Sequence, residues 1–168
     1  EEKLARRLVD FDDLLRLATR DLRADPDFAA ARRWRFRHLF VDEFQDVNPL
    51  QFGLLKEWLG DRLDLCVVGD PNQAIYAWNG ADAQYLLEFD THFPTADTVL
   101  LDENYRSTPQ ILGVANAILS TGTSHHFELR PTQPDGPAPS VRRVADETSE
   151  ANLIARRLRD AHGPGHSW

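Results

Sequence analysis

The chain has 168 residues, a formal net charge of −8, 42% hydrophobic residues and 27% charged residues, a composition typical of a globular domain rather than of a disordered segment. No apolar run approaches the ~20 residues of a membrane-spanning helix, and the first residues lack a signal-peptide pattern. The single cysteine, Cys66, excludes an internal disulfide and a multi-cysteine metal site, and it fits a reducing cytoplasm. The negative charge argues against a nucleic-acid binder that relies on charge alone.

The first predicted element is a helix. Apolar residues at spacings of three and four form one stripe over residues 4–22. An alternative is that Asp10 caps a second helix that begins at Phe11, with Asp13 three residues later. The acidic segment at 25–27, which contains a proline, is expected to break the helical pattern.

Short apolar runs then alternate with helical patterns. Strands are predicted over 39–41, 65–68 and 99–101, and helices over 50–59 and 81–89. Continuous apolar strands that alternate with helices are typical of the α/β class, with a parallel sheet covered by helices on both faces. Ligands bind such sheets at the carboxyl ends of the strands, and polar clusters follow all three predicted strands here.

The last third of the chain contains weaker signals. A helix is predicted over 109–119, with Pro109 in its first turn. The segment 121–140 is rich in Gly, Pro, Ser and Thr and is predicted to be a loop. A strand is a candidate over 141–144, and a further helix is predicted over 151–158.

Two adjacent carboxylates, Asp42 and Glu43, follow the first predicted strand. Such a pair can divide two tasks, because one carboxylate can hold Mg²⁺ while the other orients or deprotonates an attacking water. A solvated acidic turn is the simpler alternative.

The second cluster spans residues 69–82. Gln73 near a strand end can hydrogen-bond both a phosphate and a water, and Tyr76 and Trp78 offer flat faces on which nucleic-acid bases stack. In the alternative interpretation the two aromatic residues belong to the core.

The third cluster spans residues 104–107. Arg106 can supply a fixed charge to a transferring phosphoryl group, and Tyr105 can stack on a purine. The simpler alternative is the start of a helix with Ser107 or Thr108 as its N-cap.

Together the blocks DEFQDVNPLQ, VVGDPNQAIYAWNGAD and LLDENYRST resemble motifs II, III and IV of the UvrD/PcrA/Rep helicases, superfamily 1 enzymes that hydrolyse ATP and move 3′ to 5′ on single-stranded DNA. The DFDDLL stretch resembles the segment before motif II, so the resemblance covers about residues 8–120. It implies an incomplete P-loop NTPase (RecA-like) sheet flanked by helices. Residues 1–102 would be the later part of a first RecA-like domain, and residues 103–168 the beginning of a second.

The resemblance also implies roles in ATP hydrolysis. Asp42 matches the Mg²⁺-associated aspartate, and Glu43 matches the catalytic glutamate beside the metal. Gln73 matches the glutamine that senses the γ-phosphate and couples it to DNA. Tyr105 matches the tyrosine that packs on the nucleotide base, and Arg106 matches the arginine that reaches the γ-phosphate.

The DNA-binding residues implied by the resemblance are Trp78, which matches the aromatic residue that stacks on single-stranded DNA, and Tyr76 beside it. Asn79 stands where the family usually has arginine, so a hydrogen bond is retained and a charge is lost. Pro71 and Asn72 replace a more usual acidic pair.

One motif is absent. The chain has 17 arginines and only two lysines, Lys3 and Lys56, and neither follows a glycine, so a phosphate-binding Gly-Lys-Ser/Thr loop cannot form. We therefore expect an internal fragment of such a helicase, inactive by itself. Its location is expected to be cytoplasmic, and DNA repair, replication restart and recombination all stay open as its pathway. Its unpaired sheet edges are expected to favour self-association.

Three other functions fit the sequence less well. A helicase-like subunit that does not hydrolyse ATP is expected to lose the Asp-Glu pair, Gln73 or Arg106, and all are present. A carboxylate-metal nuclease would use Asp42, Glu43, Asp46 and Asp70 but lacks a lysine within reach. Zinc binding by the histidines at 125, 126, 162 and 166 is less favoured, since they lie in loops and only one cysteine is present.

Overall fold

The computed structural model describes residues 3, 6, 8–122 and 127–162. The chain divides into two compact units, Glu1–Leu100 and Leu101–Trp168, and each is described by itself. Within the described residues no helix combines the length and the apolar character needed to cross a membrane.

Two capped helices, α2 (Phe11–Ala24) and α3 (Pro26–Arg35), follow each other in the first unit. The Asp10 carboxylate accepts a hydrogen bond from the backbone of Asp13, whose side chain accepts one from the backbone of Asp10, which is a capping box. The prediction of one continuous helix over 4–22 is therefore wrong, and the alternative start at Phe11 is confirmed. The break at 25–27 is brief, because its proline is the first residue of α3, where a missing N–H costs nothing.

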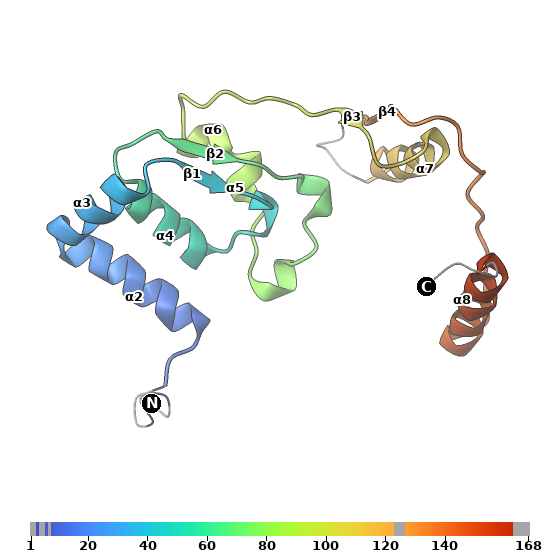
Figure 1. The fold of residues 1–168 in the computed structure, drawn as a ribbon, viewed down its shortest axis with the longest axis horizontal. Helices are drawn as coiled ribbons and strands as arrows, with labels where there is room; N and C mark the ends of the chain where they lie inside the picture. The colour runs from blue at the N-terminus through green and yellow to red at the C-terminus, as the bar shows by residue number, and fades with distance from the viewer. Residues whose placement is uncertain (1–2, 4–5, 7, 123–126, 163–168) are drawn as a thin grey trace. The chain divides into compact units, whose positions relative to one another are not determined.

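Two parallel strands form the sheet of the first unit (Figure 1). Strands β1 (Leu39–Val41) and β2 (Leu65–Val67) pair in register from Leu39 opposite Leu65 to Val41 opposite Val67. Helix α4 (Pro49–Leu59) connects them, begins with a capping box of Asn48 and Gln51, and ends at Gly60. The predictions of both strands and of this helix are confirmed.

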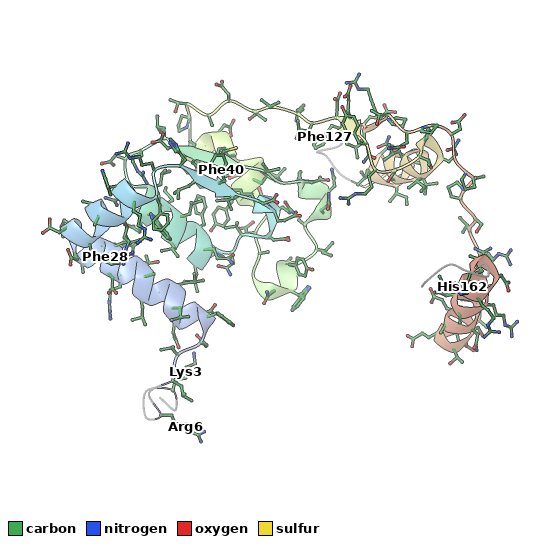
Figure 2. All side chains as sticks on the ribbon, in the orientation of Figure 1. Lys3, Arg6, Phe28, Phe40, Phe127 and His162 are labelled. Carbon is green, nitrogen blue, oxygen red and sulfur yellow. The ribbon has the colours of Figure 1, made fainter. Side chains whose placement is uncertain are left out.

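Only one face of this sheet is covered by the described helices. Val41 and Val67 pack against the buried core of Phe44, Val47 and Phe52, to which α4, α5 (Gln84–Leu87) and α6 (Phe89–His92) contribute. On the opposite face Cys66 is exposed, and the Phe40 side chain, labelled in Figure 2, is 79% exposed. The prediction of helices on both faces is thus wrong for the described residues.

Two further predictions, for segments between residues 81 and 101, are wrong. The helix predicted over 81–89 is two short helices, because Glu88 between them has a non-helical backbone, φ −106° and ψ 30°. Residues 99–101 form no strand, and Val99, Leu100 and Leu101 are exposed. A strand needs a neighbouring strand to satisfy its backbone hydrogen bonds, and no described segment pairs with this one.

The second unit contains a parallel pair of two-residue strands, β3 (Glu103–Asn104) and β4 (Arg130–Pro131), the second of which lies inside the predicted loop. Helix α7 (Pro109–Leu119) confirms the prediction for that segment. Helix α8 (Glu147–Ala161) is longer than predicted, because Asp146 caps it by accepting a hydrogen bond from the Ser149 N–H. The candidate strand over 141–144 is not formed, and Val141 is exposed.

Candidate functional site

The acidic pair follows β1 in a tight turn. Glu43 has φ 52° and ψ 45°, the left-handed region, and is the one non-glycine residue in the described chain with a positive φ. Such backbone conformations are unfavourable for side chains with a Cβ and cluster at functional sites. Both carboxylates of the pair are exposed, and Asp42 accepts a hydrogen bond from the Glu43 N–H at 2.9 Å.

The turn continues into a short 3₁₀ helix, η1 (Phe44–Asp46), which is anchored to the neighbouring strand segment. The Phe44 N–H donates to the carbonyl of Val68 at 2.9 Å, and the Val68 N–H donates to the carbonyl of Val41 at 2.8 Å. Phe44 is completely buried. The acidic pair is therefore held at a defined position relative to the end of β2.

Gln45 lies at the centre of this arrangement, and sequence reasoning assigned it no role. Its side chain is 1% exposed. Its amide nitrogen donates to the Glu43 carboxylate at 2.7 Å, and its amide oxygen accepts from the Asp70 N–H at 3.0 Å. Its neighbours in the sequence, Phe44 and Asp46, gave no signal that this glutamine is buried.

A hollow beside α4 is lined by three carboxylate residues, Asp42, Glu43 and Asp46, together with apolar residues of β1 and α4. The Asp46 Oδ1 atom is buried and has no hydrogen-bond partner in the described chain. Carboxylate oxygens are the ligands that Mg²⁺ prefers, and this ion binds through one or two carboxylates while it keeps waters and substrate phosphates. The residues at this strand end therefore fit a hydrated Mg²⁺.

Among the described residues, no group of three or more His, Cys, Asp or Glu side chains is arranged so that all of them could hold one metal ion. The four-carboxylate cluster required by the nuclease alternative is therefore not formed. Of the histidines considered for zinc, those at 125, 126 and 166 lie outside the described residues.

Gln73 lies in the 3₁₀ helix η2 (Pro71–Gln73), which follows β2. The Asp70 carboxylate organises this loop, because it accepts from the Asn72 N–H and from the Gln73 side-chain amide, both at 2.9 Å. The loops after β1 and β2 meet through Gln45 and Asp70. The structure thus brings the acidic pair and the Gln73 loop to the same end of the sheet.

The aromatic residues lie around the next 3₁₀ helix, η3 (Ala77–Asn79). Trp78 is 80% exposed and Tyr76 is 44% exposed. Their ring centroids are 6.1 Å apart, with the planes inclined at 57°. The alternative interpretation of Trp78 as a core residue is therefore wrong. Asn79 is also exposed, so this loop offers two ring faces and an amide to a ligand.

The second unit contains the Tyr105 and Arg106 cluster directly after β3. The Asn104 side chain accepts hydrogen bonds from the backbone N–H groups of Arg106 at 3.1 Å and Ser107 at 2.8 Å. This holds the turn before α7, whose N-cap position is Thr108, although the Thr108 side chain forms no capping hydrogen bond. The simpler prediction of a helix start is confirmed for the backbone.

The two side chains proposed to reach a nucleotide are exposed. The Tyr105 hydroxyl donates to the Glu103 carboxylate, and this hydrogen bond, together with the negative charge of Glu103, raises the pKa of Tyr105. The guanidinium of Arg106 has no side-chain partner in the described part of the chain, which leaves it available for an anion.

Comparison with known proteins decides the family. Residues 1–94, more than half of the chain, match the model of the UvrD/REP helicase N-terminal domain. The chain belongs to the UvrD/REP helicase family.

Three relatives illustrate how this UvrD/REP family member compares. It is 42% identical over 155 residues to the ATP-dependent DNA helicase UvrD2 of Mycobacterium tuberculosis, in a match that covers 90% of this chain and 22% of the relative. It is 39% identical over 158 residues to UvrD1 of the same organism (89% and 20%). It is 34% identical over 158 residues to PcrA of Bacillus subtilis (94% and 21%). The chain spans about a fifth of the length of these curated relatives.

Proposed function

We propose that the chain is part of an ATP-dependent DNA helicase that couples ATP hydrolysis to 3′-to-5′ movement on single-stranded DNA. Residues 1–102 would contain motifs II and III in a first RecA-like domain, and residues 103–168 would begin the second with motif IV. The observation that carries the proposal is the junction of the Asp42–Glu43 turn and the Gln73 loop at the ends of two neighbouring parallel strands. The names of the relatives, all ATP-dependent DNA helicases, support the same assignment.

Within this proposal the residues of the first unit act on the γ-phosphate of ATP. Asp42 and Glu43 would hold Mg²⁺, which supplies charge neutralisation on the phosphates. The Glu43 carboxylate takes a proton from the attacking water as a general base. Gln73 contacts the γ-phosphate and joins it to the loop that contains Tyr76 and Trp78.

The other proposed site residues contact the transferring phosphoryl group, the adenine and DNA. Arg106 supplies a guanidinium to the charge that develops on the transferring phosphoryl group, and Tyr105 stacks on the adenine. Trp78 and Tyr76 stack on DNA bases, and Asn79 donates a hydrogen bond to the DNA. Binding by stacking is compatible with the net charge of −8.

The test is Glu43→Gln in the full-length parent protein. The substitution keeps the size of the side chain and removes its basicity, so ATP binding is expected to stay near the wild-type level while turnover falls about 10²–10⁴-fold. Glu88→Gln changes an exposed carboxylate between α5 and α6 and is the matched control, with wild-type turnover expected. Near wild-type turnover by Glu43→Gln would show that the acidic pair is a solvated turn.

A further inference from the structure

We propose that Gln45 is a positioning residue that couples the Glu43 carboxylate to the loop containing Gln73, an inference that rests on the proposed function. A continuous chain of hydrogen bonds joins the two. Gln45 donates to Glu43 at 2.7 Å and accepts from the Asp70 N–H at 3.0 Å. The Asp70 carboxylate then accepts from the Gln73 amide at 2.9 Å.

The Gln45 amide has one orientation that satisfies both partners. The carboxylate of Glu43 can only accept and the Asp70 N–H can only donate, so the amide nitrogen must face the first and the amide oxygen the second. An apolar side chain at this position would leave the part-buried Asp70 N–H without this acceptor, and a carboxylate would face Glu43 with like charge.

The surroundings of Gln45 leave little room for another position. Its side chain is 1% exposed. A Cβ added at Gly69 would lie 2.7 Å from the Gln45 amide oxygen, 2.9 Å from a methyl group of Leu86 and 3.2 Å from the backbone nitrogen of Phe44. The absence of a side chain at Gly69 is thus what allows the amide to reach the Asp70 N–H.

The consequence concerns how DNA binding changes the rate of hydrolysis. The residues of the loop after β2 lead directly into the exposed aromatic pair, so a ligand that moves this loop displaces the Asp70 N–H. Because Gln45 is hydrogen-bonded both to that N–H and to Glu43, the Glu43 carboxylate moves with the loop after β2. Gln45 itself contacts neither phosphate nor water in this scheme, and a misplacement of about 1 Å is enough to change a rate by about 10²-fold.

The experiment uses Gln45→Met in the full-length parent, which keeps the length of the side chain and removes both hydrogen bonds. The matched control is Leu59→Ala, since Leu59 is 2% exposed and lies on α4 outside the hydrogen-bond chain. Both variants are expected to lower the melting temperature. Only Gln45→Met is expected to lower the DNA-stimulated kcat, by about 10²-fold, with the KM for ATP unchanged.

A second variant, Gly69→Ala, tests the same point without changing any polar group. Its methyl group makes its shortest contact with the Gln45 amide oxygen, which must move, and it also contacts Leu86 and the Phe44 backbone. It is expected to reduce DNA stimulation of kcat in the same way, and it decides the matter if Gln45→Met does not fold. DNA stimulation equal to that of Leu59→Ala in the folded variants would overturn the proposal. If Glu43→Gln also keeps full turnover, the proposed function is wrong too. If Glu43→Gln loses turnover, only the role of Gln45 is wrong.

Discussion

Replacing Trp78 with alanine is expected to weaken binding of single-stranded DNA while it leaves the stability of the protein unchanged. The side chain is 80% exposed, and its ring contacts the ring of Tyr76, with the centroids 6.1 Å apart. A surface substitution of this kind changes the free energy of unfolding by no more than about 0.5 kcal/mol. Stacking of one base on an aromatic ring contributes about 1–3 kcal/mol, so the Kd should rise about 5–150-fold.

The assay is fluorescence anisotropy of a labelled oligothymidylate with the full-length parent at a fixed salt concentration, combined with thermal melting of the same samples. Trp34→Ala is the matched control, because Trp34 is 72% exposed, lies on α3 and has no proposed contact with DNA. A Trp78→Ala protein that melts normally and binds DNA as tightly as wild type would refute the stacking role. A large drop in melting temperature would refute the argument from exposure.

Two further predictions address the second unit and the first helix. Arg106→Ala in the parent should lower ATP turnover by about 10³-fold at unchanged DNA affinity. Arg106→Lys should restore the turnover only partly, because an ammonium lacks the planar fork of the guanidinium. An equal loss of DNA affinity in Arg106→Ala would contradict a role at the phosphate. The hydrogen bonds from Lys3 and from the Asp13 N–H lower the pKa of Asp10 from 3.8 to about 2. The stability that the Asp10 carboxylate contributes is therefore complete above about pH 4 and lost as the pH falls through about 2. Between pH 5 and pH 2 the melting temperature should fall more steeply for wild type than for Asp10→Asn, whose side chain still caps the helix but does not titrate.

The elements that could be predicted from the sequence are those with local signals. Strands β1 and β2 are continuous apolar runs, and α4 lies between a capping pair and Gly60. The segment 99–101 has the same apolar character and forms no strand, because pairing depends on a neighbouring strand and not on composition. The prediction of helices on both sheet faces failed for a similar reason, because the covering of a face depends on packing partners elsewhere in the fold.

The candidate site shows a similar division. The order and spacing of the motifs predict the acidic pair, Gln73 and the aromatic residues as site residues. The exposure of Trp78 then separates two interpretations that the sequence left open. Gln45 was missed, because its contacts arise only when the turn after β1 folds against the loop after β2. No pattern in the sequence marks a glutamine as buried between a carboxylate and a backbone N–H.

The most direct test of the central claim is strand displacement by the full-length parent on two DNA duplexes that differ only in the polarity of their single-stranded tail. The proposed helicase should separate the duplex with a 3′ tail in an ATP-dependent reaction and leave the 5′-tailed duplex intact, and Glu43→Gln should abolish the activity. ATP-dependent separation of the 5′-tailed duplex alone, or no separation of either duplex by a protein that binds ATP and DNA, would contradict the proposed function.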